Sequence, residues 1–139
     1  MKRALGLDIG RVRIGVALSD PLGAFAQGID VLDAGKDWMA LVRDMVREKG
    51  VDVVVVGIPI NTDGSRGPEA ERILGIIERL RERVGDERIE IVPWDERFTT
   101  VQAERALLEG NLSRRGRRGV VDKVAASLIL QSFLESRRS

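Results

Sequence analysis

The chain has 139 residues, 43% of them hydrophobic, and a formal net charge of +1, so it is long enough for one domain with a buried core. It contains no cysteine and no histidine, which excludes disulfides, thiolate nucleophiles, Ser-His-Asp triads and metal sites built on sulfur or imidazole. Residues 97–139 hold 9 Lys/Arg against 4 Asp/Glu, whereas residues 1–96 hold 14 against 18, so the C-terminal third suits an anionic partner.

The chain opens with three segments in which apolar residues alternate with small or polar ones, as in half-buried strands. Short links that contain glycine join them, which predicts an antiparallel meander. The three predicted strands cover residues 3–9, 12–19 and 24–32.

A second part of the sequence alternates helices and strands. Helical spacing of apolar residues predicts a helix over 36–49. The run "VDVVVVGIPI" that follows is continuous and β-branched, which indicates a central strand covered on both faces. A helix is predicted over 68–84, with Pro68 suited to its first turn, and "RIEIVPW" predicts another strand.

The last part of the chain is expected to be helical. Thr99 and Gln102 form a capping box for a helix over 100–109, a polar loop follows over 110–119, and a final helix is predicted over 120–136. The whole pattern predicts an α/β fold with a five-stranded mixed sheet, an antiparallel meander followed by parallel strands, and helices on both faces. Since no long linker interrupts it, we expect residues 1–139 to form a single domain.

We find no signal peptide and no membrane-spanning stretch in the sequence. The longest apolar run, in residues 53–60, has the length of a strand and is interrupted by Gly57 and Pro59. The sequence therefore predicts a cytoplasmic protein without a membrane partner.

Three carboxylates stand out, although each has an ordinary structural explanation. Asp8 lies on a strand otherwise fit for burial, and it could simply start a turn. Glu96 follows the last predicted strand and could be a solvated loop acid. Asp122 is expected in the first turn of the final helix, where the helix dipole favours a carboxylate by about 0.3–1 kcal/mol. Asp122 also shares a helical face with Ala126, Ile129 and Phe133, so a cation or donor is expected beside it.

Taken together, the three acids predict a catalytic site. Ligands of open sheets bind beyond the carboxyl ends of parallel strands, and Asp8 and Glu96 are expected there, with Asp122 joining them from the final helix. Three converging carboxylates need a cation between them, and oxygen ligands select Mg²⁺ or Mn²⁺. Carboxylate-held metal ions can activate water and clamp a scissile phosphate without histidine.

Four stretches also resemble one known family: "LGLDIGRVRIGVALSD", "VVVVGIPINTDGSRGPEAE", "WDERFTT" and "VVDKVAASLILQSFLE". Together they are similar to the YqgF (RuvX) family of bacterial proteins, which are related to Holliday junction resolvases and named as candidate pre-16S rRNA nucleases. The resemblance runs nearly end to end and implies an RNase H-like fold. It places the family's acidic residues on Asp8, Glu96 and Asp122, and its arginine on Arg13.

The loops beside this site are expected to hold nucleic acid. The stretch "GIPINTDGSRGP" allows close backbone approach at its glycines, and the resemblance favours contacts of Asn61 and Ser65 with a nucleic-acid backbone. The stretch "NLSRRGRRG" would add non-specific phosphate binding as a loop that closes over the substrate. The basic residues assigned to nucleic-acid binding are Arg13, Arg97, Arg114, Arg115, Arg117 and Arg118.

These features predict a metal-dependent nuclease that acts in 5′-end processing of pre-16S rRNA during ribosome biogenesis, with pre-rRNA or a ribosomal precursor as partner. Two alternatives stay open: a Holliday junction resolvase that acts on branched DNA, and a non-catalytic RNA-binding ribosome assembly factor. An actin-like or sugar-kinase ATPase would need two such domains, for which 139 residues are too few. The sequence leaves open a monomer or a homodimer, and endo- or exonucleolytic cleavage.

Overall fold

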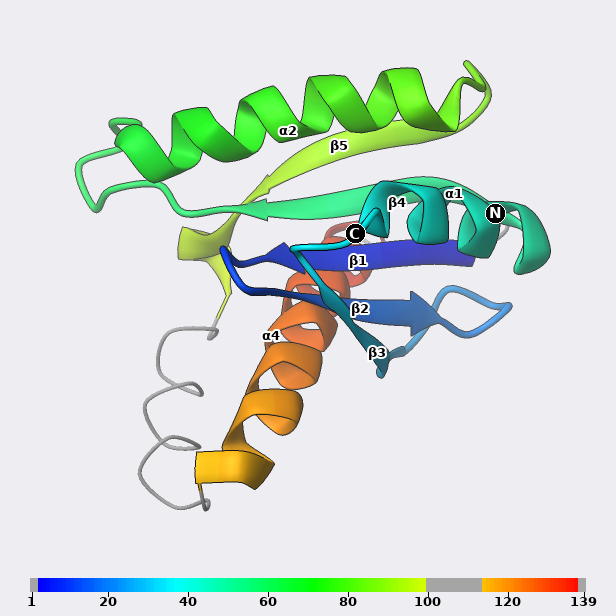
Figure 1. Cartoon of the computed structure of the whole chain (residues 1–139), viewed down its shortest axis with the longest axis horizontal. Coiled ribbons are helices and arrows are strands. Elements are labelled where there is room, and N and C mark those ends of the chain that lie inside the picture. The colour runs from blue at the N-terminus through cyan, green and yellow to red at the C-terminus, as the bar shows by residue number, and fades with distance from the viewer. Residues whose placement is uncertain (1–2, 100–113, 138–139) are drawn as a thin grey trace.

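The computed structural model describes residues 3–99 and 114–137, which form one five-stranded sheet with helices on both of its faces (Figure 1). The strand order is β3-β2-β1-β4-β5; β2 runs antiparallel to β1 and β3, and β4 runs parallel to β1 and β5. The elements are β1 (Arg3–Ile9), β2 (Arg13–Ser19), β3 (Ala26–Asp33), α1 (Trp38–Glu48), β4 (Val51–Ile58), α2 (Pro68–Val84), β5 (Glu90–Asp95), the 3₁₀ turn η1 (Glu96–Phe98) and α4 (Arg114–Ser136).

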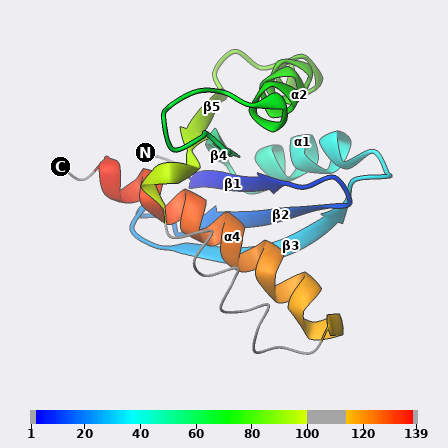
Figure 2. The same ribbon diagram turned by 90° about the vertical axis from the view of Figure 1, so that its left-hand side faces the viewer.

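The sheet and the first two helices confirm the prediction, with boundaries that differ by a few residues at most. The helix expected over 100–109 lies outside the described residues. The loop expected over 110–119 is wrong in part, because α4 begins at Arg114 rather than at residue 120. Arginine is a good helix former, and a glycine inside a helix costs only about 1 kcal/mol, so Gly116 and Gly119 do not end the helix. The backbone of this first part of α4 extends past the sheet beside β3 (Figures 1 and 2).

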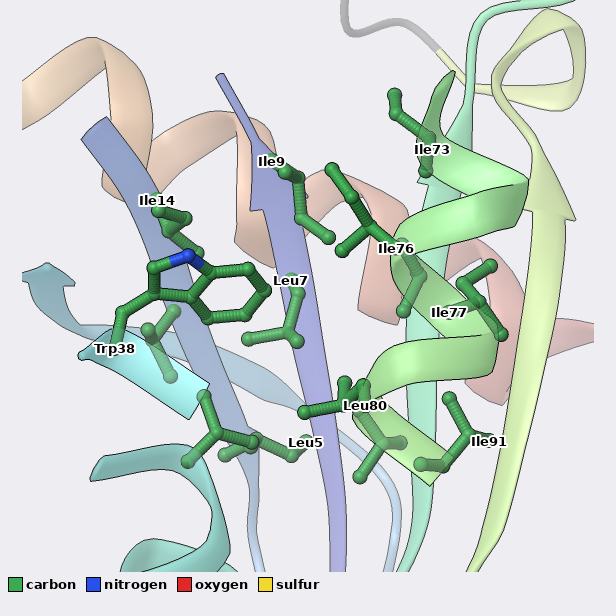
Figure 3. Close-up of a cluster of buried hydrophobic side chains, with 14 of the residues drawn as sticks. Leu5, Leu7, Ile9, Ile14, Trp38, Ile73, Ile76, Ile77, Leu80 and Ile91 are labelled. Carbon is green, nitrogen blue, oxygen red and sulfur yellow. The ribbon is translucent and has the colours of Figure 1, made fainter. Parts of the chain in front are cut away.

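The face of the sheet under α1 and α2 is packed with large aliphatic side chains. Leu5, Leu7 and Ile9 alternate along β1 and all point to this face, where they are at most 6% exposed. Figure 3 shows them with Trp38 of α1 and with four residues of α2: Ile73, Ile76, Ile77 and Leu80. This cluster is the larger part of the core.

The opposite face carries glycine and alanine on β1 and β2 and the valines Val53 and Val55 on β4, and it is covered by α4, which crosses the strands (Figure 2). Four strands present a glycine to the helix, and a Cβ at any of them would lie within 2.7 Å of an α4 atom. The closest approach is at Gly15, where a Cβ would lie 2.0 Å from the backbone oxygen of Asp122. The glycines are Gly6 in β1, Gly15 in β2, Gly28 in β3 and Gly57 in β4.

Within residues 3–99 and 114–137, the helices lack the combination of length and apolar character that a membrane span requires.

The packing of α4 predicts the effect of adding one methyl group at Gly15. We expect Gly15→Ala to lower the free energy of unfolding by about 1–3 kcal/mol, because the backbone of α4 must move to admit it. Gly75→Ala is the control, since a Cβ there meets nothing within 4 Å, and it should raise the free energy of unfolding by about 0.5–1 kcal/mol because alanine favours the helix. Urea unfolding of both variants measures the difference, and equal effects would contradict the proposed close approach.

Candidate active site

Asp8 is a buried carboxylate at the carboxyl end of β1. Its side chain is on the α4 face, because Asp8 has the same strand parity as Ala4 and Gly6, and the residue is 8% exposed. Across the antiparallel pair it is opposite Gly15, on which the backbone of Asp122 rests. The close approach of α4 therefore brings its third turn beside Asp8.

Glu96 lies just past the end of β5, in a turn held from both sides. The backbone N–H of Arg97 donates to Asp95 Oδ1 at 2.9 Å, and the Thr99 hydroxyl donates to the Glu96 carbonyl oxygen at 2.8 Å. The Glu96 side chain lies over β4, since a Cβ on Gly57 would be 3.2 Å from Glu96 Cγ. The turn thus directs Glu96 to the α4 face of the sheet.

Asp122 contacts Arg13 of β2. The Arg13 Nε donates to Asp122 Oδ2 at 2.6 Å, and the two side chains are 35% and 16% exposed, respectively. The expected cation beside this carboxylate is confirmed. The expected placement in the first helical turn is wrong, because α4 begins at Arg114 and Asp122 lies in its third turn. A charge-assisted hydrogen bond to arginine, rather than the helix dipole, is therefore its observed stabilising contact.

The three predicted acids occupy the same side and the same edge of the sheet. Leu7 pairs with Val56, so Asp8 and Gly57 follow next on the two parallel strands, and Gly57 is the residue that Glu96 covers. However, among residues 3–99 and 114–137 no three acidic side chains lie close enough together to hold a metal ion. The structure therefore places Asp8 and Glu96 over neighbouring strand ends and pairs Asp122 with Arg13.

The loop between β4 and α2 is ordered by its own polar side chains. The backbone N–H of Asn61 donates to the Ser65 carbonyl oxygen, and Asn61 Nδ2 donates to Ser65 Oγ, both at 3.0 Å. The hydroxyl and N–H of Ser65 both donate to Asp63 Oδ1, which lowers the pKa of Asp63. Asn61 and Ser65 are exposed, and their predicted contact with nucleic acid stays a prediction.

Arg97 is held beside this loop by Asp95. Its Nε and Nη2 donate to Asp95 Oδ2 at 2.9 and 2.7 Å, and this ion pair lowers the pKa of the Asp95 carboxyl. Arg97 Nη1 lies 3.5 Å from the position of a Cβ on Gly64. Asp95 is not among the site residues predicted from the sequence. The signal for its role is the Asp-Glu-Arg order, which puts an acid and a base on either side of Glu96.

Two further arginines near the site form ion pairs, whereas the side chains of the arginines at the start of α4 are not described. Arg11, in the turn after β1, pairs with Glu69 at 2.9 Å and so ties that turn to the start of α2. Arg72 also pairs with Glu69, and this pair is the main cause of the lowered pKa of Glu69. The side chains of the predicted set in α4 lie outside the described part of the chain: Arg114, Arg115, Arg117 and Arg118.

Known proteins match nearly the whole chain. A model of the RuvX family, described as Holliday junction resolvase, matches residues 2–136. A protein of Pelotomaculum thermopropionicum is 49% identical over 138 residues, which cover 97% of this chain and 88% of that protein. A protein of Caldanaerobacter subterraneus subsp. tengcongensis is 45% identical over 140 residues, which cover 99% of each chain. Both are named "Putative pre-16S rRNA nuclease".

Two solved structures share the fold. Thermus thermophilus RuvC in complex with a Holliday junction substrate has a TM-score of 0.59 at 13% identity and covers 100% of this chain and 97% of its own. Fowlpox virus resolvase with Holliday junction DNA has a TM-score of 0.61 at 15% identity and covers 99% of each chain. These likenesses confirm the predicted RNase H-like architecture.

The contact between β2 and α4 predicts unequal effects for two neighbouring arginines. Arg13→Gln should lower the free energy of unfolding by about 1–2 kcal/mol, because Asp122 loses a charged donor in a partly buried place. Arg11→Gln removes the same charge from a side chain that is 70% exposed, and surface ion pairs contribute little, so it should have only a small effect. Urea unfolding of both variants checks this, and equal losses would show that the Arg13 contact is no stronger than a surface pair.

Proposed function

This chain belongs to the RuvX family, and we propose that it is a nuclease that hydrolyses phosphodiester bonds in the 5′-end processing of pre-16S rRNA. The names of the relatives from two bacteria support the substrate. The near-complete match to the family model supports carrying the activity to this chain.

The observation that carries the proposal is the placement of Asp8 and Glu96. Both carboxylates lie on the α4 face at the carboxyl edge of parallel strands, the edge at which open sheets bind ligands. Asp8 is only 8% exposed, so its carboxylate is held in a largely buried position at this edge. We therefore assign the reacting phosphodiester to this edge, with Asp8 and Glu96 as catalytic residues.

Asp122 is the third proposed catalytic residue, and Arg13 positions it. The 2.6 Å contact fixes the carboxylate against β2, while the backbone of Asp122 is fixed by its close approach to Gly15. The Arg13 side chain is 35% exposed, so it can also contact the phosphate backbone of a substrate.

We propose Mg²⁺ or Mn²⁺ as the cofactor on the chemistry of the donor set. The three acids offer only oxygen ligands, and the chain has no histidine or cysteine, which suits a hard divalent cation. The described residues do not by themselves assemble three acids into a metal-holding group. When bound, such an ion would supply charge stabilisation at the phosphate.

Substrate binding is proposed for the polar groups that surround this edge. Asn61 and Ser65 lie in the ordered loop after β4, and Arg97 lies against the same loop. The arginines at the start of α4 add positive charge to the same helix as Asp122, which favours phosphate binding that weakens with salt. These are Arg114, Arg115, Arg117 and Arg118.

Branched DNA is the second candidate substrate, because the matching family model is described as Holliday junction resolvase. Resolution of a junction needs two cuts, so this alternative function also requires two copies of the chain.

A cleavage assay tests the function and separates the two substrates. Labelled single-stranded RNA, a pre-16S 5′ fragment and a four-way DNA junction are incubated with Mg²⁺, Mn²⁺ or EDTA. We expect cleavage of the pre-16S fragment with a divalent ion, and a loss of at least about 100-fold in Asp8→Asn because the reacting centre loses a charge. Asp86→Asn, an acid in the loop between α2 and β5 that pairs with Arg88, is the control and should keep wild-type activity.

Other outcomes of that assay have definite meanings. Preferred cutting of the junction would replace RNA processing with junction resolution. Binding without cutting under every metal would contradict the nuclease proposal and favour a non-catalytic assembly factor.

Metal binding is tested separately from cleavage. Titration of Mn²⁺ followed by calorimetry should give a binding isotherm for the wild-type chain that Asp8→Asn weakens by about 10–100-fold, while Asp86→Asn leaves it unchanged. An identical isotherm for all three proteins would remove Asp8 from the ligand set.

A further inference from the structure

A pocket lies beside the candidate site, on the other face of the same strand ends. Its volume is 280 Å³, and it opens between the loop after β4, the start of α2 and the end of β5. The residues that line it and matter here are Ile58, Ile60, Leu74, Pro93, Arg66 and Arg97.

The walls of this edge pocket are fixed before anything binds. Ile60 and Arg66 form a β-bridge that closes the loop, and Gly64 adopts φ +88°, a left-handed conformation suited to glycine. Asp95 holds Arg97 through two guanidinium nitrogens. A preformed site of this kind has a low ordering cost when a ligand enters.

The chemistry of the pocket combines an apolar wall with an available cation. The partly buried Ile60 and Leu74 and the exposed Pro93 offer apolar surface, and Arg66 and Arg97 also line the pocket. In residues 3–99 and 114–137 no carboxylate forms an ion pair with Arg66, which is exposed. This combination suits a ligand with one flat ring and an attached anion.

The size of the pocket limits that ligand to one ring system. Pockets for drug-sized ligands hold roughly 300–1,000 Å³, and this one lies just below that range. A single nucleobase fits such a volume, and a base that enters the pocket has to leave the stack and its pairing partner first.

The position of the pocket joins it to the reacting centre. Ile58 of the pocket follows Gly57, the residue that Glu96 covers on the α4 face. Asp95 and Arg97 of the pocket directly flank Glu96 in the sequence. A strand whose phosphate lies at Glu96 therefore needs to pass only around the end of β4 and β5 to place a neighbouring nucleotide in the pocket.

We propose that the edge pocket binds one unpaired nucleotide of the substrate, next to the phosphodiester that is cut, with its base against Ile60, Leu74 and Pro93 and its phosphate on Arg66. This inference rests on the proposed nuclease function and adds to it a preference for a single-stranded segment at the cleavage site.

Binding in EDTA tests the pocket without catalysis. The probes are a fluorescein-labelled RNA decamer, the same decamer with every base removed, and the matched DNA decamer. Leu74→Trp fills the pocket and should weaken binding of the intact RNA by at least about fivefold, as the loss of one base contact does, and leave the base-free RNA unchanged. Arg66→Gln should weaken both RNAs and lower the slope of log K against log salt by about 0.7.

Arg79→Gln is the matched control, because Arg79 is an exposed arginine of α2 that does not line the pocket; it should change affinity by less than Arg66→Gln. Equal effects of Leu74→Trp on the intact and base-free RNAs, or of the two arginine variants, would overturn the proposal. If Leu74→Trp does not fold by thermal melting, Ile60→Phe fills the pocket from the loop instead.

The DNA decamer shows whether the pocket distinguishes the sugar. If the wild-type chain binds the DNA decamer more weakly than the RNA decamer, and Leu74→Trp does not weaken DNA binding further, the pocket takes an RNA nucleotide. If the wild-type chain binds both decamers equally and Leu74→Trp weakens both, the pocket takes a nucleotide of either kind. Because no cleavage is needed, this result stands apart from the outcome of the nuclease assay.

Discussion

The close approach of α4 to the sheet is the contact on which the candidate site depends. Glycines on four strands leave room for the helix, and at Gly15 the backbone oxygen of Asp122 occupies the space that a side chain would fill. This contact sets the position of the third turn of α4 relative to β2. Arg13, two residues earlier on β2, can then reach the Asp122 carboxylate at 2.6 Å. A packing contact thus determines an electrostatic one.

One face of the sheet supplies the larger hydrophobic cluster, and the other face carries the candidate catalytic acids. Alternating residues of β1 give large aliphatic side chains to the α1 and α2 face, and Ala4, Gly6 and Asp8 to the α4 face. The aliphatic face holds the larger of the two buried hydrophobic clusters, and burial of its apolar surface offsets the cost of a buried carboxylate on the other face. The acids therefore lie on the face that is closest to a helix backbone, where small residues leave space for them.

The fold was largely predictable from local patterns, whereas the site was predictable only in part. Strand alternation and the β-branched run in β4 are properties of a few neighbouring residues, and they located all five strands. The start of α4 was misplaced because arginine-rich, glycine-containing stretches suit a loop as well as a helix. That error also misplaced Asp122 within its helix and attributed its stabilisation to the helix dipole instead of Arg13.

The sequence by itself determined the fold class, the oxygen-only donor set and the burial of Asp8, because each follows from residue type and short-range periodicity. Only the tertiary structure decided which partner each acid takes. Arg13 and Asp122 are 109 residues apart in the chain, and Glu96 and Gly57 meet only because β4 and β5 are neighbours in the sheet. Such contacts depend on how packed layers come together in space, which no short stretch of sequence encodes.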